Sequence, residues 1–401
     1  MLKLIKVNIK VIVLKIINLI PCSSLLLGSP RKISTGMELA LKNDINLKYI
    51  KSFIKQETVI ERPPGTVETD VFYKFKKLYN RLQPENYILH IKNGRVWGNN
   101  GAVITSDDIF LSDVSVEFGR AKFNSKEHPL FYKLKLKPPE ELKGTIAVVA
   151  SPGSNIYAHW LFDILPRLIV LRKSGLFDTI DKLIINHDNL DFQRETLEKL
   201  NLENIQFINS FRKPDFHIRA ENLVVPSYPN KHATVNKWVC DEVKGLFSKN
   251  NLPENSLASK FVKPNLRLYI SRQNKPGRNF NNEDEVFNLL REYGFEKIQC
   301  ENYSIAEKAG IFKNAEYVIG THGSGLANVV FCKAGCKVIN IFSPNYFDTF
   351  LWSLANASEL QYYYFFGEGE IPEIQDNRPN QNFDITVNMD RFKQLMTKVF
   401  H

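Results

Sequence analysis

Hydrophobic and polar residues alternate in two different ways along the chain, and each pattern predicts a different kind of structure. From Asn86 to Gly119 the alternation has the short period of β-strands, interrupted by a turn at Lys92-Asn93-Gly94, and it predicts antiparallel hairpins. From Thr145 onward, short apolar runs alternate with segments of helical period, which predicts βαβ units and a parallel sheet. In this first series the predicted strands are 145–150, 182–187, 205–208 and 222–226, and the predicted helices are 157–173, 191–200 and 232–248.

A polar, proline-containing stretch at residues 249–264 is predicted to be an interdomain linker. A second series of the same kind follows it. Its predicted strands are 266–271, 295–299, 317–320 and 336–342, its predicted helices are 282–293, 304–314 and 325–331, and closing helices are expected at 346–357 and 390–400. The fold class is therefore α/β, with two Rossmann-like domains that face a cleft, because ligands of such domains bind at the carboxyl ends of the strands.

A chain of 401 residues is longer than a single hydrophobic core usually supports, which also favours two domains. The predicted parts are a tail (1–37), a β-rich extension (38–140), a first Rossmann-like domain on the acceptor side (141–255), a second on the donor side (256–385) and a closing C-terminal helix (386–401).

The net charge of +10 suggests a nucleic-acid partner, but its distribution argues against one. Residues 1–37 contain six lysines and arginines and no acid, so most of the excess lies in the tail. Within residues 1–20, isoleucines fall on one helical face and lysines on another, which predicts an amphipathic helix lying on an anionic membrane surface. An apolar arm packed on the protein and a poor signal peptide are the alternatives. The five scattered cysteines imply no disulfide framework.

The segment Tyr317–Phe331, Y-V-I-G-T-H-G-S-G-L-A-N-V-V-F, carries the strongest functional signal. A short apolar strand leads through a glycine-rich turn into a predicted helix. Such a turn leaves backbone N–H groups unpaired at the helix start, where they and the helix dipole suit a phosphate. A tight turn with a packed histidine is the alternative. The spacing matches neither the Walker A motif nor GxGxxG.

A second motif, N-I-Y-A-H-W-L-F-D-I-L-P-R, runs from Asn155 to Arg167 after the first strand of the first series. His159 and Asp163 are four residues apart and share one helix face, which makes them candidates for acid–base chemistry or for a helix cap. Pro166 is expected to kink or end the first turn of this helix.

A third motif, Tyr269-Ile270-Ser271-Arg272, closes a strand of the second series, and Arg278 follows it. Two arginines at a strand end can clamp a diphosphate, although a solvated basic loop is the alternative. Glu283 begins the next helix, where it can cap the helix or bind a ribose hydroxyl.

The three motifs, in this order and spacing, resemble glycosyltransferase family 61, in particular its bacterial capsular-polysaccharide type. The resemblance covers roughly residues 85–345. It implies a GT-B architecture, a nucleotide-sugar donor that is usually a UDP-sugar, and inversion at the anomeric carbon. The residues that it places at the donor diphosphate are Arg272, Arg278, Glu283, His322, Gly323, Ser324, Gly325 and Asn328, and those on the acceptor side or in the cleft are Asn155, Tyr157, Trp160 and Arg167. Ser324 departs from the family pattern, in which alanine is common.

Inverting transfer needs a base, and we favour Asp163 over His159, with His159 as the base oriented by Asp163 as the second assignment. No D-x-D motif is present, so we expect no metal and no cofactor beyond the co-substrate. The expected partners are the nucleotide-sugar and a glycan or lipid-linked glycan, with no nucleic acid. The expected location is the cytoplasm, with peripheral contact at the inner membrane face. A dinucleotide-dependent oxidoreductase and a non-catalytic glycan-binding protein are the alternatives.

Overall fold

The computed structural model describes residues 29–30, 32–42, 47–51, 54–119, 125–133, 135–202, 205–231, 233–248, 256–261, 263–272, 279–369 and 384–400. The predicted amphipathic helix of residues 1–20 lies outside this part of the chain. The chain divides into two compact units. Unit 1 comprises Met1–Gln56 and Pro84–Pro229, and unit 2 comprises Glu57–Gln83 and Asn230–His401.

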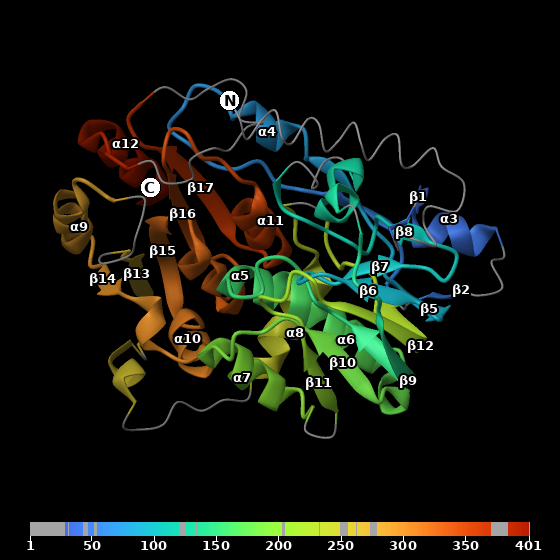
Figure 1. The fold of residues 1–401 in the computed structure, drawn as a ribbon. Helices are drawn as coiled ribbons and strands as arrows, with labels where there is room; N and C mark the ends of the chain where they lie inside the picture. Colours follow the sequence, from blue (N-terminus) through green and yellow to red (C-terminus); the bar gives the residue numbers. More distant parts are fainter. Residues whose placement is uncertain are drawn as a thin grey trace, which may run out of the picture. The chain divides into compact units, whose positions relative to one another are not determined.

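Unit 1 is built on a mixed sheet to which ten of the described strands contribute (Figure 1). The strand order is β1-β8-β7-β6-β12-β9-β10-β11, and β5 and β2 extend it beside β12. The strands are β1 (Lys32–Ser34), β2 (Leu47–Lys51), β5 (Tyr87–Lys92), β6 (Arg95–Trp97), β7 (Ala102–Ile104), β8 (Ile109–Leu111), β9 (Glu140–Val148), β10 (Lys182–Ile185), β11 (Gln206–Asn209) and β12 (His217–Pro226). The four strands β12, β9, β10 and β11 are parallel, as the βαβ pattern predicts.

The helices of unit 1 are short. They are α3 (Gly36–Leu41), the run α5 (Tyr157–His159), η4 (Trp160–Ile164) and α6 (Leu165–Lys173), then α7 (Asp191–Lys199) and the 3-10 helices η2 (Ser125–Glu127), η3 (Pro129–Tyr132) and η5 (Phe177–Thr179). The helices α6 and α7 supply the crossovers between β9, β10 and β11, close to the predicted ranges 157–173 and 191–200.

The predicted hairpin at Lys92-Asn93-Gly94 is wrong. Both β5 and β6 pair with β12, one after the other, so the chain continues along the same neighbour instead of reversing. Asn93 adopts a positive φ of 51° and its N–H donates to the carbonyl of Glu221, so the segment between β5 and β6 stays bonded to β12. The hairpins lie further on, between β6 and β7 and between β7 and β8.

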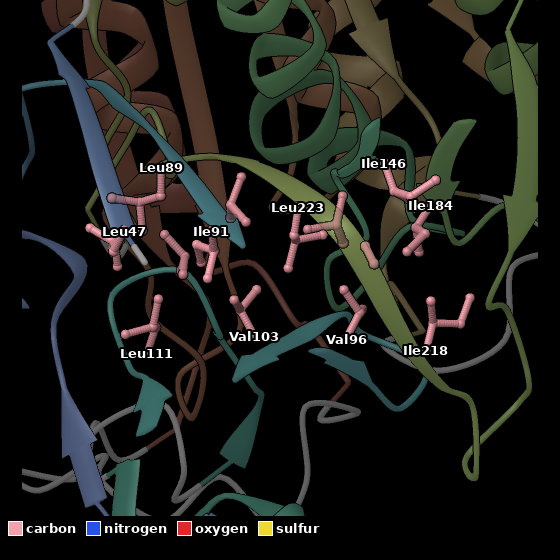
Figure 2. Packing of buried hydrophobic residues seen from close by; sticks show 14 of the residues in the cluster. Leu47, Leu89, Ile91, Val96, Val103, Leu111, Ile146, Ile184, Ile218 and Leu223 are labelled. Carbon is pink, nitrogen blue, oxygen red and sulfur yellow. The ribbon is translucent and has the colours of Figure 1, made fainter. Parts of the chain in front are cut away.

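One hydrophobic core joins the two halves of unit 1 (Figure 2). Buried side chains from strands that precede residue 140 pack with side chains from the parallel strands. The residues labelled in Figure 2 are Leu47, Leu89, Ile91, Val96, Val103, Leu111, Ile146, Ile184, Ile218 and Leu223. Strands from the predicted β-rich extension and the predicted first Rossmann-like domain therefore share a sheet and a core.

Unit 2 contains a five-stranded sheet in the described part of the chain, and all of its pairings are parallel. The spatial order is β14 (Glu296–Ile298), β13 (Leu266–Ile270), β15 (Ala315–Thr321), β16 (Lys337–Phe342) and β17 (Gln361–Phe366). Strand β17 had no counterpart among the predicted elements. The connections change direction between β13 and β15, and a doubly wound sheet binds ligands at such a switch point, at the carboxyl ends of the strands.

Helices cover both faces of this sheet (Figure 1). On one face α9 (Glu283–Glu292) and α12 (Met389–Phe400) bury apolar side chains against β13, β15, β16 and β17. The other helices pack largely with one another: α8 (Lys237–Phe247), α10 (Ile305–Phe312), α11 (Phe350–Ala357) and the 3-10 helix η8 (Ser324–Phe331). Two further 3-10 helices are η6 (Leu257–Phe261) and η7 (Cys300–Asn302). The predicted helix at 325–331 is thus a 3-10 helix.

Two parts of unit 2 differ from the predicted boundaries. Residues 57–83, with β3 (Glu57–Ile60), α4 (Tyr73–Lys76) and β4 (Asn80–Gln83), belong to unit 2 and not to an N-terminal extension. A buried salt bridge of 2.6 Å joins Arg81 to Glu61, and Arg81 also donates to Asn236. The described part of the predicted linker 249–264 includes η6, whose Ala258 and Phe261 are buried, and the boundary between the units falls at residues 229 and 230 instead.

Candidate active site

In unit 2 the strand order brings the third motif and the glycine-rich turn to the same place. Ser271 and Arg272 follow β13, and His322 and Gly323 follow β15, the two neighbours at the switch point. A Cβ atom added to Gly323 would lie 2.7 Å from the Nη1 atom of Arg272. Only a residue without a side chain therefore lets the guanidinium lie against this turn, and the predicted partners Arg272 and Gly323 are in fact neighbours. Arg278 lies outside the described residues.

The imidazole of His322 is held from several sides. It is only 8% exposed, its ring stacks on Phe342 at a centroid distance of 4.9 Å, and Tyr346 lies 5.0 Å away. Its backbone N–H donates to the carbonyl of Ile341 at 2.8 Å. The Nδ1 atom lies 3.1 Å from the side-chain nitrogen of Asn340 in β16. His322 is therefore a fixed group at the carboxyl edge of the sheet.

Residues of η8 support the glycine-rich turn that follows β15. Asn328 is completely buried and donates from its side chain to the carbonyl of Gly325 at 2.9 Å. A Cβ on Gly325 would lie 3.1 Å from the Cγ2 atom of Ile270, so this position also has little room. Ser324 remains partly exposed. Among the predicted donor residues, Asn328 and Gly325 thus support the turn, while Gly323 and Ser324 are the ones a ligand can approach.

Glu283 begins α9 at the same edge of the sheet. Its carboxylate accepts a hydrogen bond from the Ser271 hydroxyl at 2.5 Å, and the Nζ atom of Lys297 lies 3.8 Å away. The bond between Ser271 and Glu283 ties the end of β13 to the start of α9. Glu283 is therefore held against Ser271, the residue that precedes Arg272.

In unit 1 the corresponding switch point lies between β9 and β12, and Arg167 occupies its interior. Its guanidinium donates to the carbonyls of Ala150 at 3.0 Å, Val148 at 3.2 Å and Pro226 at 3.2 Å, and it lies 4.5 Å from the centre of the Tyr228 ring. Burial lowers the pKa of Arg167, and the nearby Tyr228 and Asp163 oppose that shift.

Two of the predicted acceptor-side residues prove to be internal supports. Arg167 and Trp160 are both fully buried, and the Trp160 indole donates to the Thr196 hydroxyl at 2.7 Å. Neither side chain is available to contact an acceptor, because each is packed inside unit 1. Asn155 is exposed, and Tyr157 is half-buried with its ring 5.5 Å from that of Phe192, so these two remain accessible.

His159 and Asp163 form a hydrogen-bonded pair. The Nδ1 atom of His159 lies 2.7 Å from Oδ2 of Asp163, and their side chains are 39% and 31% exposed. The pair lies where α5 passes into η4, a stretch of π-helix that ends just before Pro166. Proline has no N–H to donate within an α-helix, so the interruption expected at Pro166 takes the form of this wider turn.

Two residues next to these sites, Phe118 and Asn340, were not among the residues predicted from the sequence. Phe118 is 45% exposed, and its ring centre lies 5.2 Å from that of His159. Gly153 makes room for both rings, since a Cβ there would lie 2.8 Å from His159 and 3.0 Å from Phe118. No local pattern marks Phe118. Asn340 left a signal in the sequence, because it is a single amide within the otherwise apolar strand segment Val338–Phe342.

Residues 157–339 match the family model described as Glycosyltransferase 61. The match supports the resemblance of this segment to glycosyltransferase family 61. The protein is accordingly a glycosyltransferase, and the match favours that activity over the oxidoreductase and the non-catalytic binding protein. Comparison with curated proteins found no match.

The matched segment of this glycosyltransferase begins at Tyr157 and ends one residue before Asn340, so it includes His159, Asp163, Arg272 and His322. Within the described ranges, no group of three or more histidine, cysteine or acidic side chains could hold a metal ion. No helix in that same part of the chain is long and apolar enough to cross a membrane.

Proposed function

We propose that this glycosyltransferase moves a sugar from a nucleotide-sugar, with a UDP-sugar as the expected donor, to a glycan or lipid-linked glycan, with inversion at the anomeric carbon. We place this reaction in capsular or exopolysaccharide biosynthesis. The observation that carries the proposal is the meeting of Arg272, His322 and Gly323 at the switch point of unit 2. A cation, a fixed imidazole and a turn without side chains together suit a diphosphate.

Two buried hydroxyl groups at the same edge support a ligand there. Thr321 ends β15 and Ser343 follows β16, and in the described part of the chain neither hydroxyl has a hydrogen-bond partner. A buried polar group without a partner costs about 1–3 kcal/mol. A bound polar ligand or water would recover that free energy.

In unit 1, we propose that His159 removes the proton from the acceptor hydroxyl and that Asp163 orients it. A carboxylate only accepts hydrogen bonds, so the 2.7 Å contact puts a proton on Nδ1 of His159 and leaves the lone pair of a neutral ring on Nε2. The acceptor oxygen then forms a bond to the anomeric carbon as the bond to the diphosphate breaks. Negative charge collects on the leaving diphosphate, where Arg272 and His322 stabilise it.

The decisive experiment measures turnover of a panel of UDP-, GDP- and CMP-sugars by the purified protein and by two variants. His322→Ala and Arg272→Ala should each lower turnover by about 100-fold or more, because each removes a donor from the position of the leaving group. Arg219→Ala, at an exposed ion pair with Glu141, serves as the control and should keep full activity. Full activity in both site variants would refute the assignment of the donor site. Transfer should persist in excess EDTA.

A further inference from the structure

Asn340 occupies a position that is costly for an amide. It lies in β16, it is completely buried, and its neighbours along the strand are apolar. Its side-chain nitrogen lies 3.1 Å from Nδ1 of His322 and 2.8 Å from the hydroxyl oxygen of Tyr362. Burying an amide is unfavourable unless its hydrogen bonds are replaced, and these two contacts replace those of the NH₂ group. The position therefore connects the imidazole to the interior of the sheet.

The chemistry of the amide nitrogen determines the state of the imidazole. An amide NH₂ group has two hydrogens to donate and accepts nothing. With that group at 3.1 Å, Nδ1 of His322 must be the acceptor, and the proton of the neutral ring then lies on Nε2. The stacking on Phe342 and the backbone bond to Ile341 keep the ring from turning away.

We propose that Asn340 is a positioning residue that holds His322 as the Nε2–H tautomer, so that His322 offers a hydrogen-bond donor to the leaving diphosphate. The opposite tautomer would direct a lone pair at the phosphate oxygens and repel them. The tautomer itself follows from the contacts of unit 2, whereas its use in catalysis rests on the function proposed above.

The side-chain oxygen of Asn340 defines the competing arrangement. It is buried and has no hydrogen-bond partner among the described residues. If the amide were rotated by half a turn, this oxygen would face His322 and require a proton on Nδ1. The two arrangements thus predict opposite tautomers, and a single measurement distinguishes them.

That measurement is a long-range ¹H–¹⁵N correlation spectrum of the full-length protein labelled with ¹⁵N-histidine. Signals of His322 are identified by their loss in His322→Gln. We expect the pattern of an Nε2–H tautomer near neutral pH. An Nδ1–H pattern would overturn the inference while leaving the glycosyltransferase assignment untouched. The experiment does not depend on whether a variant of Asn340 folds.

Two substitutions extend the test to catalysis. Asn340→Leu removes the donor at similar volume and should lower kcat about 10-fold to 100-fold, the usual range for a group that orients another, with little change in KM for the donor. Asn340→Asp places an acceptor beside Nδ1, so the ring should keep both protons to higher pH than in the wild type. Asn314→Leu is the matched control, because Asn314 immediately precedes β15 at the amino edge of the sheet.

The outcomes also separate this inference from the proposed function. An Nε2–H tautomer together with full turnover in His322→Ala would support the structural role of Asn340 and refute the catalytic role of His322. An unchanged tautomer and unchanged kcat in Asn340→Leu would refute the positioning role.

Discussion

At the scale of single residues, the buried Arg167 of unit 1 differs in exposure and in contacts from the nearby pair of His159 and Asp163. Arg167 binds three carbonyls that end β9 and β12 and lies inside the unit. His159 and Asp163 are partly exposed and lie on the turns just before it. One motif thus supplies both an internal support and the partly exposed pair to which we assign the proton transfer.

Arg167→Met should lower the free energy of unfolding by about 3 kcal/mol. The methionine fills most of the volume but leaves carbonyl groups without a donor, and each such group costs about 1–3 kcal/mol. Denaturant unfolding measures the effect. Arg219→Met is the control and should change stability by less than about 1 kcal/mol, because the ion pair of Arg219 with Glu141 is exposed. Equal effects in the two variants would contradict the supporting role of Arg167.

Kinetic measurements on two variants identify the catalytic base. If His159 is the base, His159→Gln should lower kcat more than Asp163→Asn does, and the acid limb of kcat/KM should fall where histidine titrates, at about pH 6–7. If Asp163 is the base, as the sequence alone suggested, Asp163→Asn should abolish transfer while donor binding survives. Near-normal rates in both variants would place the base elsewhere.

At the scale of elements, the first turn of α10 is stabilised by a reciprocal cap. The Ser304 hydroxyl accepts a hydrogen bond from the N–H of Glu307 at 3.2 Å, and the Glu307 carboxylate accepts one from the N–H of Ser304 at 2.9 Å. Burial acts to raise the pKa of Glu307, but hydrogen bonds from Ser256 and Ser304 outweigh it, and the net pKa is lowered. The charged carboxylate is therefore the form that stabilises the helix.

Ser304→Ala should lower stability by about 1 kcal/mol at neutral pH. Because the pKa of Glu307 is lower in the folded state, its contribution is present above the unfolded pKa and is lost as the pH falls through the folded value. The contribution removed by Glu307→Gln should accordingly shrink in acid. Thermal unfolding of each variant across pH checks both statements, with exposed Ser259→Ala as the control for Ser304→Ala. A pH-independent loss in Glu307→Gln would contradict this account of the cap.

At the scale of the whole molecule, each unit has its own hydrophobic core, and the ionisable side chains buried in unit 1 differ from those buried in unit 2. His128 and His217 are both buried in unit 1, and burial lowers the pKa of each to about 4. The Nδ1 atom of His217 is 2.5 Å from the carbonyl oxygen of Lys137, so it carries the proton of the neutral ring. The Nε2 atom is buried and has no hydrogen-bond partner among the described residues. Both histidines are therefore neutral in the folded unit.

Unit 1 should lose stability as the pH falls from about 6.5 to 4. In that window the histidines of the unfolded chain become protonated, while the folded ones stay neutral. Each such histidine therefore lowers the free energy of unfolding by about 1.4 kcal/mol per pH unit. Hydrogen exchange followed by mass spectrometry should show peptides of unit 1 opening before those of unit 2. His217→Gln should reduce the pH dependence, because it removes one of these groups. Equal acid sensitivity of the two units, or an unchanged slope in the variant, would contradict the prediction.

Local pattern determined much of this molecule. The α/β class, the positions of most strands and helices from Thr145 onward, and the three motifs are all readable from the sequence, because periodicity and glycine placement act over a few residues. The interruption at Pro166 is also local, since it follows from a missing N–H. The glycosyltransferase assignment depends on the same short segments.

Only the tertiary structure decided which residues meet. The chain does not reverse at Asn93 because β12 runs past both β5 and β6, and nothing near Lys92-Asn93-Gly94 encodes that neighbour. Arg167 is internal because β9 and β12, far apart in sequence, both end beside it. The tautomer that we propose for His322 depends in the same way on Asn340 from the next strand. Hydrogen bonds and burial act between groups that chain folding brings together, so sequence patterns locate the candidate residues and the packed sheets determine which groups each one contacts.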